Sequence, residues 1–467
     1  MTRNSTPADA IGHPSADDPT APAVVAHLSS ARLTIAIVAL GAAVHDNDGT
    51  LAQAALAWLT IAIVYAFWAM LHGHEVTGRL HHAVRTVALI VSAGLFCRSG
   101  VAAALPQNQF RVALLLSTAL AVAAAAICVA RTSLLPRLHA LLLLLLAAAY
   151  ALLLLTQLPV PGIDVLQYQR ESATAVLEGR NPYAMTFRDP YTPEASAQFF
   201  GPGLSVDGVL QFGNPYMPLV TLLALPGLLL GDVRYASGLA LLASAWLIAS
   251  ATRSRSGYLG SALLLLSPAF PDLVVFGWTE AYVVLLLSAT WYCRCRAPAW
   301  LPYVAGLFFV SKQYTIILAP ALLLLLPRPW CWTDALAFGL RAAVAALLVT
   351  LPMVLRDPDA FLRSAVLLQF RQPFRVDALS YLAMAHPADP QRWMPLPFGL
   401  AACAWAVIFR RDRLRPVVFP LASGLVFLVF FAFNKQAFLN YYFLVIAALC
   451  AALAADGSDQ PPLNATR

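Results

Sequence analysis

Charged side chains are scarce in this chain of 467 residues: Asp, Glu, Lys and Arg make up 11% of it, whereas hydrophobic residues make up 60% and the mean hydropathy is +0.71. This balance excludes a water-soluble globular protein, because the polar side chains are too few to cover its surface. A helix that spans a bilayer needs about 20 mostly apolar residues. We therefore predict an all-α fold, a polytopic transmembrane helical bundle that forms one integrated domain in a lipid bilayer.

Lysine is nearly absent, since only Lys312 and Lys435 among the 30 basic residues are lysines. Such an excess of arginine, with abundant alanine and leucine, is typical of GC-rich bacterial coding, so we expect a bacterial cell (inner) membrane. The net charge of +7 does not indicate a nucleic-acid partner, because the basic residues are scattered between apolar segments, where they set orientation. The seven cysteines lie outside the two long polar loops, and we expect no disulfide framework.

Three catalytic motifs are also missing: a glycine-rich phosphate loop, a His-Glu-x-x-His motif and a Gly-x-Ser-x-Gly elbow. A histidine-rich connector contains His72, His74, His81 and His82, for which a solvated turn is favoured over a metal site. We predict no cofactor, and the need for a divalent metal stays open.

Apolar runs alternate with short polar connectors along the chain. The runs that predict about 14 spans lie near residues 31–44, 51–71, 83–105, 110–130, 138–157, 235–251, 258–270, 281–293, 299–311, 315–327, 334–354, 396–409, 416–433 and 438–455. The run at 217–231 is short and contains two prolines, which predicts a re-entrant or interfacial segment. The basic connectors place both termini in the cytoplasm, with a disordered tail at 1–30 and a second tail at 456–467. Two long loops, 158–216 and 355–395, then lie on the extracytoplasmic side.

The first long loop places an acidic residue, Asp164, directly after a predicted span. Asp164 precedes a predicted helix over 165–178, with Gln167 three positions on and Gly179 at its end, which is the pattern of a capping box with a glycine stop. Two interpretations therefore stand: Asp164 caps a helix, or it is a catalytic base at the membrane surface. Tyr168 and Glu171 share its face at helical spacing, where they line an acceptor site or form a solvated face.

Four basic residues and one acid stand near the outer ends of apolar runs. An ammonium at the interface is a compact phosphate partner. Two interpretations therefore stand for Lys312 and Lys435: they bind phosphate, or their side chains reach the membrane interface without a functional role. Arg371 and Arg375 in the second loop bind phosphate or anchor that loop. Glu280 hydrogen-bonds a sugar, caps a helix or pairs with Lys312, and the sequence leaves these three open. Because the polar residues gather on one side, chemistry at one membrane face is favoured over transport through the membrane.

At this point the chain resembles the C-type membrane glycosyltransferases, and among them glycosyltransferase family 87, whose members depend on polyprenyl-phosphate-mannose. The segments that carry the resemblance are Gly162-Ile-Asp164, Glu178-Gly-Arg-Asn-Pro-Tyr183, Asn214-Pro-Tyr-Met-Pro-Leu219, Gly277-Trp-Thr-Glu280, Ser311-Lys-Gln-Tyr314, Arg371-Gln-Pro-Phe-Arg375 and Asn434-Lys-Gln-Ala-Phe-Leu-Asn440-Tyr-Tyr442. The resemblance covers residues 138–455 and leaves 31–137 as an N-terminal extension of four spans.

The resemblance implies a transferase that moves a mannose-like hexose or a pentose from a polyprenyl-phosphate sugar to a glycan or lipid acceptor of the cell envelope. It gives Asp164 the role of general base in an inverting reaction on the extracytoplasmic face. It implies that Lys312, Lys435, Arg371 and Arg375 bind the donor phosphate, and that the substrates contact Tyr168, Glu171, Tyr183, Glu280 and Asn440. Many such enzymes carry a second acid in the first loop, for which Glu171, Glu178 and Asp189 are candidates. A transporter or flippase of polysaccharide or lipid-linked sugars is the alternative, and a non-catalytic scaffold is the third class.

Overall fold

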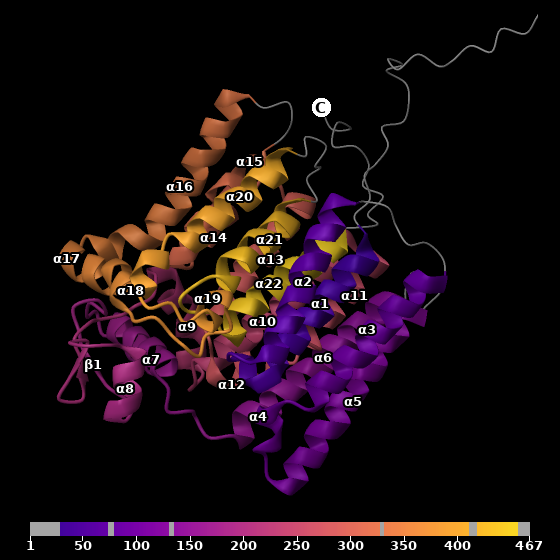
Figure 1. The fold of residues 1–467 in the computed structure, drawn as a ribbon, viewed down its shortest axis with the longest axis horizontal. Coiled ribbons are helices and arrows are strands. Elements are labelled where there is room, and N and C mark those ends of the chain that lie inside the picture. The colour runs from indigo at the N-terminus through magenta and orange to yellow at the C-terminus, as the bar shows by residue number, and fades with distance from the viewer. Residues whose placement is uncertain (1–28, 73–78, 130–134, 327–330, 411–417, 456–467) are drawn as a thin grey trace, which may run out of the picture.

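The computed structural model describes residues 29–72, 79–129, 135–326, 331–410 and 418–455, which are almost entirely helical (Figure 1). The first helices are α1 (Ser30–His45), the 3-10 helix η1 (Asp46–Gly49), α2 (Gln53–Leu71), α3 (Arg79–Cys97), α4 (Gly100–Ala103), α5 (Gln107–Val129), α6 (Leu135–Gln157), α7 (Asp164–Leu177), α8 (Pro193–Phe199), α9 (Pro218–Leu229) and α10 (Arg234–Thr252). The strands are β1 (Phe187–Arg188), β2 (Ser205–Val206) and β3 (Val209–Leu210), which form an antiparallel sheet in the order β1-β3-β2.

The second half of the chain continues with helices only among its described residues. They are α11 (Arg255–Leu265), α12 (Phe270–Phe276), α13 (Glu280–Arg296), α14 (Leu301–Phe309), the 3-10 helix η2 (Gln313–Ala321), α15 (Leu322–Leu325), α16 (Trp332–Val354), α17 (Pro358–Phe361), the π-helix η3 (Leu362–Leu367), α18 (Leu368–Arg371), α19 (Tyr381–Met384), the 3-10 helix η4 (Pro390–Trp393), α20 (Leu396–Arg410), α21 (Val418–Ala432) and α22 (Leu439–Ala455).

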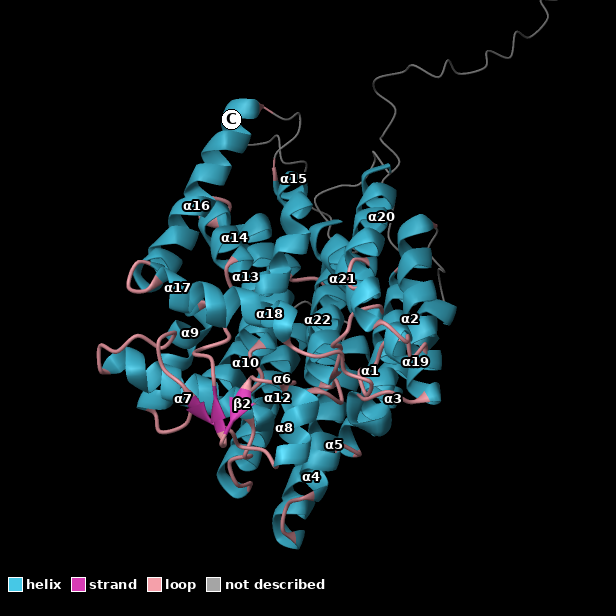
Figure 2. Cartoon of the chain, turned by 60° about the vertical axis from the view of Figure 1, so that its left-hand side comes forward, coloured by secondary structure: helices cyan, strands magenta, loops and turns pink. Residues whose placement is uncertain are grey.

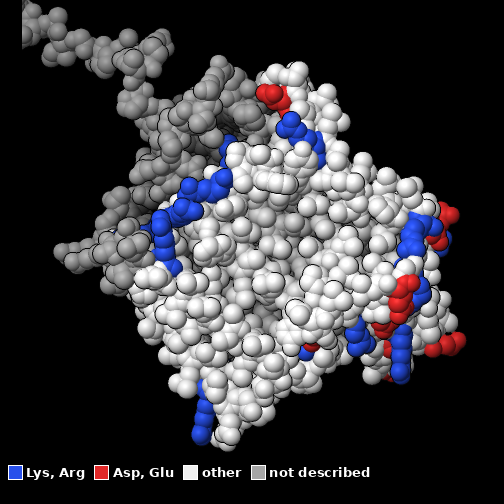
Figure 3. Space-filling model, turned by 180° about the vertical axis from the view of Figure 1, so that it is seen from behind, with Lys and Arg blue, Asp and Glu red and all other residues white. Residues whose placement is uncertain are grey.

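Six described helices are long and apolar enough to cross a membrane, which confirms the prediction of an all-helical membrane bundle. They are Gln53–Leu71, Leu80–Ala103, Gln107–Ala126, Arg137–Gln157, Arg234–Thr252 and Trp332–Val354. A seventh results if α11 and α12, which are bent by 54°, count as one span. The other predicted spans correspond to shorter apolar helices, so the described residues contain fewer full-length spans than the 14 expected. The broad centre of the face in Figure 3 carries almost no charged side chain, as a surface in contact with lipid requires.

The centre of the bundle is formed by helices that are apolar on every side. All but two residues of α22 are buried, and α22 packs against α1, α10, α11, α13 and α21. A helix that is hydrophobic all round is stable only where other helices surround it. The last helix of the chain is therefore part of the central core.

The predicted N-terminal extension, 31–137, packs into the same body as the rest of the chain. The turn after α1 pairs Thr50 with Ala378 in an antiparallel bridge, and the amide of Leu51 donates to the Asp377 carbonyl at 2.9 Å. Gly49 has φ +71°, and a Cβ added to it would lie 2.6 Å from the Cβ of Leu439. This contact leaves room only for glycine, so the extension is joined closely to the C-terminal part.

The first long loop and the first part of the second, 355–371, lie together at one end of the molecule, where α7, α8 and the sheet meet α17 and α18 (Figures 1 and 2). Arg356 donates to the Gly179 carbonyl at 2.5 Å, and the Gly213 amide donates to Ser364 Oγ at 2.9 Å. A second hydrophobic cluster, here called the loop core, holds this layer together. Its buried members are Tyr168, Phe187, Phe200, Leu204, Leu210, Phe212 and Leu368.

Several predictions fall on segments that the structure does not describe. They are the tail at 1–30 except its last two residues, the tail at 456–467, His74, most of the connector at 131–137 and most of the basic run at 410–415. Their predicted positions remain predictions.

Candidate active site

The helix α7 places the carboxylate of Asp164 at its first position. Ile163 occupies the capping position in an extended conformation, and the Val165 amide donates to Asp164 Oδ1 at 2.8 Å. The capping box predicted for Asp164 and Gln167 is therefore wrong, because the helix begins at Asp164, one residue earlier than that motif requires. The glycine stop is confirmed: Gly179 has φ +72°, and the Arg180 amide behind it donates to the Ala175 carbonyl at 2.7 Å.

The carboxylate of Asp164 is partly exposed and receives both of its hydrogen bonds on one oxygen. Tyr191 Oη donates to Oδ1 at 2.9 Å, on the same atom that accepts the Val165 amide. Among the described residues no donor reaches Oδ2. Burial raises the pKa of this carboxyl above its ordinary value, against the opposing effects of Tyr191, the Val165 amide and the positive charge of Arg375. A carboxylate with a raised pKa and an unoccupied oxygen is suited to accept a proton.

A second acid, Asp189, holds Tyr191 in place. The Tyr191 amide donates to Asp189 Oδ1 at 3.0 Å, and the hydroxyls of Ser196 and Ser205 donate to Oδ2. Burial opposes ionisation of Asp189, but these hydrogen bonds outweigh it and keep the pKa of its carboxyl below the ordinary value. Of the three candidates for a second acid in the loop, Asp189 is thus the one linked to Asp164, through Tyr191.

The other two candidates lie apart from this link. Glu178 forms an exposed ion pair with Arg180. Glu171 is half-buried on α7, two turns beyond Asp164. Tyr191 was not among the predicted site residues, although it follows Asp189-Pro190 in the same loop; nothing in the local sequence shows that it folds back 27 positions to Asp164.

Arg375 brings positive charge toward Asp164 from the second loop. Its guanidinium makes two hydrogen bonds to Asp377, at 2.8 and 2.6 Å, and lies 4.3 Å from the ring centre of Phe199 and 4.8 Å from that of Phe438. Cations over aromatic faces are stabilised by the ring quadrupole. Arg371, at the end of α18, is exposed and makes no ion pair with another described residue.

Glu280 and Lys312 form a buried ion pair between the start of α13 and the start of η2. Lys312 Nζ lies 2.9 Å from Glu280 Oε1 and also donates to the Thr279 hydroxyl. Tyr314 Oη donates to Oε1 at 3.3 Å, and Asn440 Nδ2 donates to Oε2 at 2.8 Å. Of the three interpretations left open for Glu280, the structure thus shows the pairing with Lys312.

Tyr216 packs against Lys312 and is within electrostatic reach of both carboxylates. Lys312 Nζ is 4.7 Å from the centre of its ring. Burial raises the pKa of the Tyr216 hydroxyl, and the negative charges of Asp164 and Glu280 raise it further. The Asp164 site and the Glu280–Lys312 pair therefore belong to one continuous region.

Tyr168 and Tyr183, two predicted substrate contacts, are each only 2% exposed. Tyr183 Oη donates to the Tyr216 carbonyl at 2.8 Å, and its ring packs on Phe361, so it supports the site from behind. Tyr168 belongs to the loop core, with its ring 4.8 Å from that of Phe187, and its buried hydroxyl has no partner among the described residues. Neither ring lines an open surface.

Lys435 joins the turn between α21 and α22 to the second loop. Its Nζ donates to the carbonyls of Gln369 and Gln372 at 2.8 and 2.7 Å, where α18 ends. Burial lowers the pKa of this ammonium to about 8. With two of its three N–H groups occupied, Lys435 has one left for a ligand.

The described residues contain no group of three or more His, Cys, Asp or Glu side chains that could hold a metal ion. No family model, curated protein or solved structure matches this chain. The resemblance to C-type glycosyltransferases accordingly stays a prediction, and the site rests on its own geometry.

Proposed function

We propose that this protein is a membrane glycosyltransferase that moves a hexose or pentose from a polyprenyl-phosphate sugar to a glycan or lipid acceptor. In this proposal the end that carries the two long loops faces the extracytoplasmic side. The observation that carries it is the Asp164 carboxylate, which is partly open and follows the candidate span Arg137–Gln157, and one oxygen of which receives no donor from the described part of the chain. Such a group meets a water-borne or lipid-borne acceptor at the membrane surface.

Asp164 is the general base in this mechanism. Its Oδ2 accepts the proton of the acceptor hydroxyl while the hydroxyl oxygen attacks the anomeric carbon of the donor sugar. The bond from that carbon to the phosphate oxygen breaks, and the electron pair leaves with the polyprenyl phosphate. A single displacement of this kind inverts the anomeric configuration. Base assistance contributes about 10² to 10⁴-fold, and the hydrogen bonds on Oδ1 hold the carboxylate in one orientation.

The departing phosphate develops negative charge and needs cations near it. Arg371 forms no ion pair with any residue that the structure describes, Lys435 retains one N–H, and Arg375 raises the positive potential close to Asp164. Lys312 is engaged by Glu280, so it has the least capacity to bind the phosphate directly. We therefore assign the phosphate to the second loop and to Lys435.

A direct test uses the purified protein in lipid nanodiscs with a panel of polyprenyl-phosphate sugars. Release of polyprenyl phosphate from one donor, its loss in Asp164→Asn and inversion at the anomeric carbon are the expected results. No release from any donor in the panel, with or without a glycan acceptor mixture, contradicts the proposal.

The buried pair Glu280–Lys312 favours a second candidate function, a flippase or transporter of lipid-linked sugars, because paired charges inside membrane proteins often mark transport pathways. An assay in proteoliposomes distinguishes the transporter from the transferase. A transporter moves labelled lipid-linked sugar between the leaflets without breaking the sugar–phosphate bond, and it keeps this activity in Asp164→Asn.

A further inference from the structure

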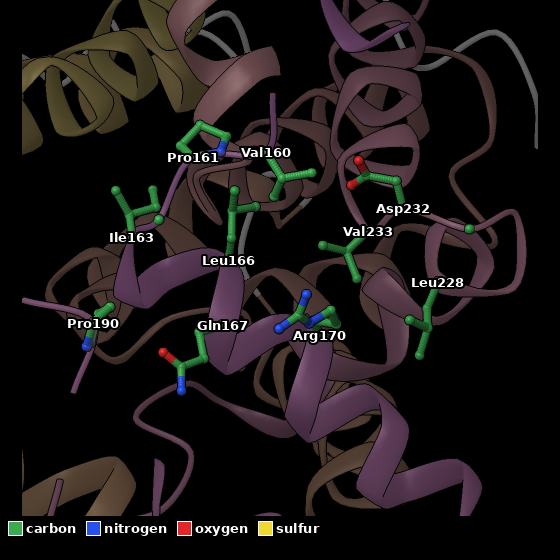
Figure 4. A pocket seen from close by; sticks show the side chains of 12 residues that line it. Val160, Pro161, Ile163, Leu166, Gln167, Arg170, Pro190, Leu228, Asp232 and Val233 are labelled. Atoms are coloured by element: carbon green, nitrogen blue, oxygen red, sulfur yellow. The ribbon is translucent and has the colours of Figure 1, made fainter. Parts of the chain in front are cut away.

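A pocket of about 300 Å³ lies beside α7 (Figure 4). Its walls come from the segment between α6 and α7, from α7 itself, from the end of α9 with the turn between α9 and α10, and from Pro190 of the first loop. On α7 the pocket is lined by Leu166, Gln167 and Arg170, whereas Asp164 and Tyr168 lie about a third to two fifths of a turn from the middle of that stripe, toward the loop core. Asp164 therefore does not line the pocket, although the lining residue Ile163 directly precedes it.

The pocket stands at the level where two neighbouring candidate spans end. One of these, Arg137–Gln157, leads directly into the lining segment that contains Gly162, and the other, Arg234–Thr252, begins directly after the lining residues Asp232 and Val233. These two helices pack against each other. The ends of adjacent spans mark the headgroup region of a bilayer, so the pocket lies at headgroup depth.

The rim next to the pocket is strongly apolar. Leu228 lines it, and the two leucines that follow, Leu229 and Leu230, are 72% and 73% exposed. Leucines exposed to this extent beside the start of a span are stable where acyl chains cover them. The apolar part of a ligand thus has a surface to lie on outside the pocket.

Two opposite charges stand on different walls of the pocket. Arg170, on α7, is exposed, and its guanidinium makes no hydrogen bond or ion pair with another described residue. Asp232, on the turn, pairs with the buried Arg234 at 2.7 Å, receives the Arg234 amide on Oδ1 at 2.9 Å and keeps 18% of its side chain exposed. A carboxylate has about four acceptor positions. Among the described residues, the Arg234 amide fills one on Oδ1, and Arg234 Nε at 2.8 Å and Nη2 fill two on Oδ2. One position remains for a donor from a ligand.

We propose that this pocket binds the headgroup of a membrane phospholipid whose phosphate is followed by a primary ammonium. The phosphate pairs with Arg170, the ammonium donates to Asp232, and the acyl chains lie over Leu229 and Leu230. A volume of about 300 Å³ is at the lower limit of small-molecule sites, which suits a headgroup without its tails. The bound lipid fixes the start of α7, and with it Asp164, relative to the bilayer. The binding itself does not depend on the proposed transferase activity.

The test measures binding of short-chain phosphatidylethanolamine to the purified full-length protein in detergent by native mass spectrometry. Wild type is expected to bind it, and Arg170→Ala to lose affinity by about tenfold or more, because a charge-assisted contact to phosphate is removed. Gly162→Phe is expected to block the pocket, since a Cβ at Gly162 meets no atom within 4 Å and the ring fills empty space. Arg188→Ala, which removes an exposed arginine of β1 outside the pocket, is the matched control and keeps wild-type affinity.

Three other ligands test which kind of molecule occupies the pocket. Phosphatidylcholine, whose ammonium has no N–H, is expected to bind more weakly, and glycerophosphoethanolamine, which lacks the acyl chains, weaker still. Equal affinity of wild type and Arg170→Ala for phosphatidylethanolamine overturns the proposal, as does equal binding of the water-soluble headgroup. Arg170-dependent binding of a short polyprenyl phosphate without binding of phosphatidylethanolamine also overturns it and assigns the pocket to a lipid-linked donor.

Discussion

Two carboxylates begin two helices at the same end of this molecule, and their surroundings differ. Asp164, the first residue of α7, receives two hydrogen bonds on Oδ1 and none on Oδ2. Glu280, the first residue of α13, has partners on both oxygens, and one partner is the ammonium of Lys312. The charge of Glu280 is compensated inside the protein, whereas Asp164 has an atom left for a substrate.

This difference separates a carboxylate that stabilises the fold from one that is suited to chemistry. Removing one member of a buried ion pair leaves the other charge in a medium that solvates it poorly. Removing the charge of a partly exposed carboxylate leaves no unpaired partner behind. Substitutions at the two residues are therefore expected to act on different properties, one on turnover and the other on stability.

The largest expected effect is on turnover at Asp164. Asp164→Asn lowers sugar transfer by at least about 100-fold, because the amide cannot accept the proton of the acceptor. The melting temperature stays at the wild-type value, since the amide oxygen still accepts from Tyr191 and the Val165 amide. Turnover with the donor found in the panel and thermal unfolding in detergent measure the two properties.

Glu178→Gln is the matched control for that substitution. Glu178 is an exposed acid of the same loop, and Arg180 is its one ion-pair partner among the described residues. The Glu178→Gln variant is expected to keep full activity. Turnover of Asp164→Asn close to that of this control rejects Asp164 as the base.

The next effect is on stability at Glu280. Glu280→Gln is expected to lower the free energy of unfolding by about 3–5 kcal/mol, because the charge of Lys312 remains buried without its partner. The double variant Glu280→Gln/Lys312→Met removes both charges and recovers most of this loss. Thermal or denaturant unfolding of the three proteins gives the comparison. If instead Glu280→Gln has the wild-type free energy of unfolding but loses sugar binding, Glu280 is a substrate contact. Glu280 and Asp164 would then no longer differ in function.

A smaller effect is expected at Tyr191. Tyr191→Phe removes a hydrogen bond that lowers the pKa of Asp164, so that pKa rises further. The base must be deprotonated, and the acid limb of the pH–rate profile is therefore expected to move to higher pH. At the pH optimum, turnover falls by about tenfold, as for the loss of one hydrogen bond to a charged group.

A matched control for this change is Tyr381→Phe, whose hydroxyl bonds to Thr60 at 2.7 Å in another part of the bundle. It is expected to leave the acid limb where it is. An unshifted limb in Tyr191→Phe shows that the hydrogen bond to Asp164 does not tune the base.

The smallest expected effect concerns Lys435. Its pKa of about 8 means that the ammonium loses its proton as the pH rises through that value. The KM for the donor is therefore expected to rise a few-fold above pH 8 in wild type. Lys435→Arg remains charged at these pH values and is expected to show no such rise. Identical KM profiles for the two proteins mean that Lys435 only holds the end of α18.

The sequence predicts the class of fold well and the length of the helices less well. Apolar runs identify almost every helix of the bundle, but a run such as 438–455 is apolar because α22 lies in the protein core. Hydropathy measures the absence of water and does not distinguish lipid from protein as the neighbour. For this reason the predicted number of spans exceeds the number of described helices that are long enough to cross a membrane.

For the site, sequence reasoning identifies acidic and basic residues but not their partners. Asp164, Glu280 and Lys312 are all singled out by position, yet whether Glu280 meets a sugar or Lys312 depends on how α13 and η2 pack. Tyr191 reaches Asp164 only through the fold of the loop. The partners of Lys435 are backbone carbonyls, which every residue possesses. Contacts of these kinds are properties of tertiary structure and leave no local signal.

The close contact between Gly49 and Leu439 has a consequence for how the protein is made. The ribosome produces the turn after α1 long before α22, so the first helical pair enters the membrane before the helix that covers it exists. During that interval the inner face of α1 faces lipid or the insertion machinery. The packing of α1 is therefore completed only after α22 has been released, and a nascent chain that stops before Leu439 leaves its first helices without this permanent neighbour.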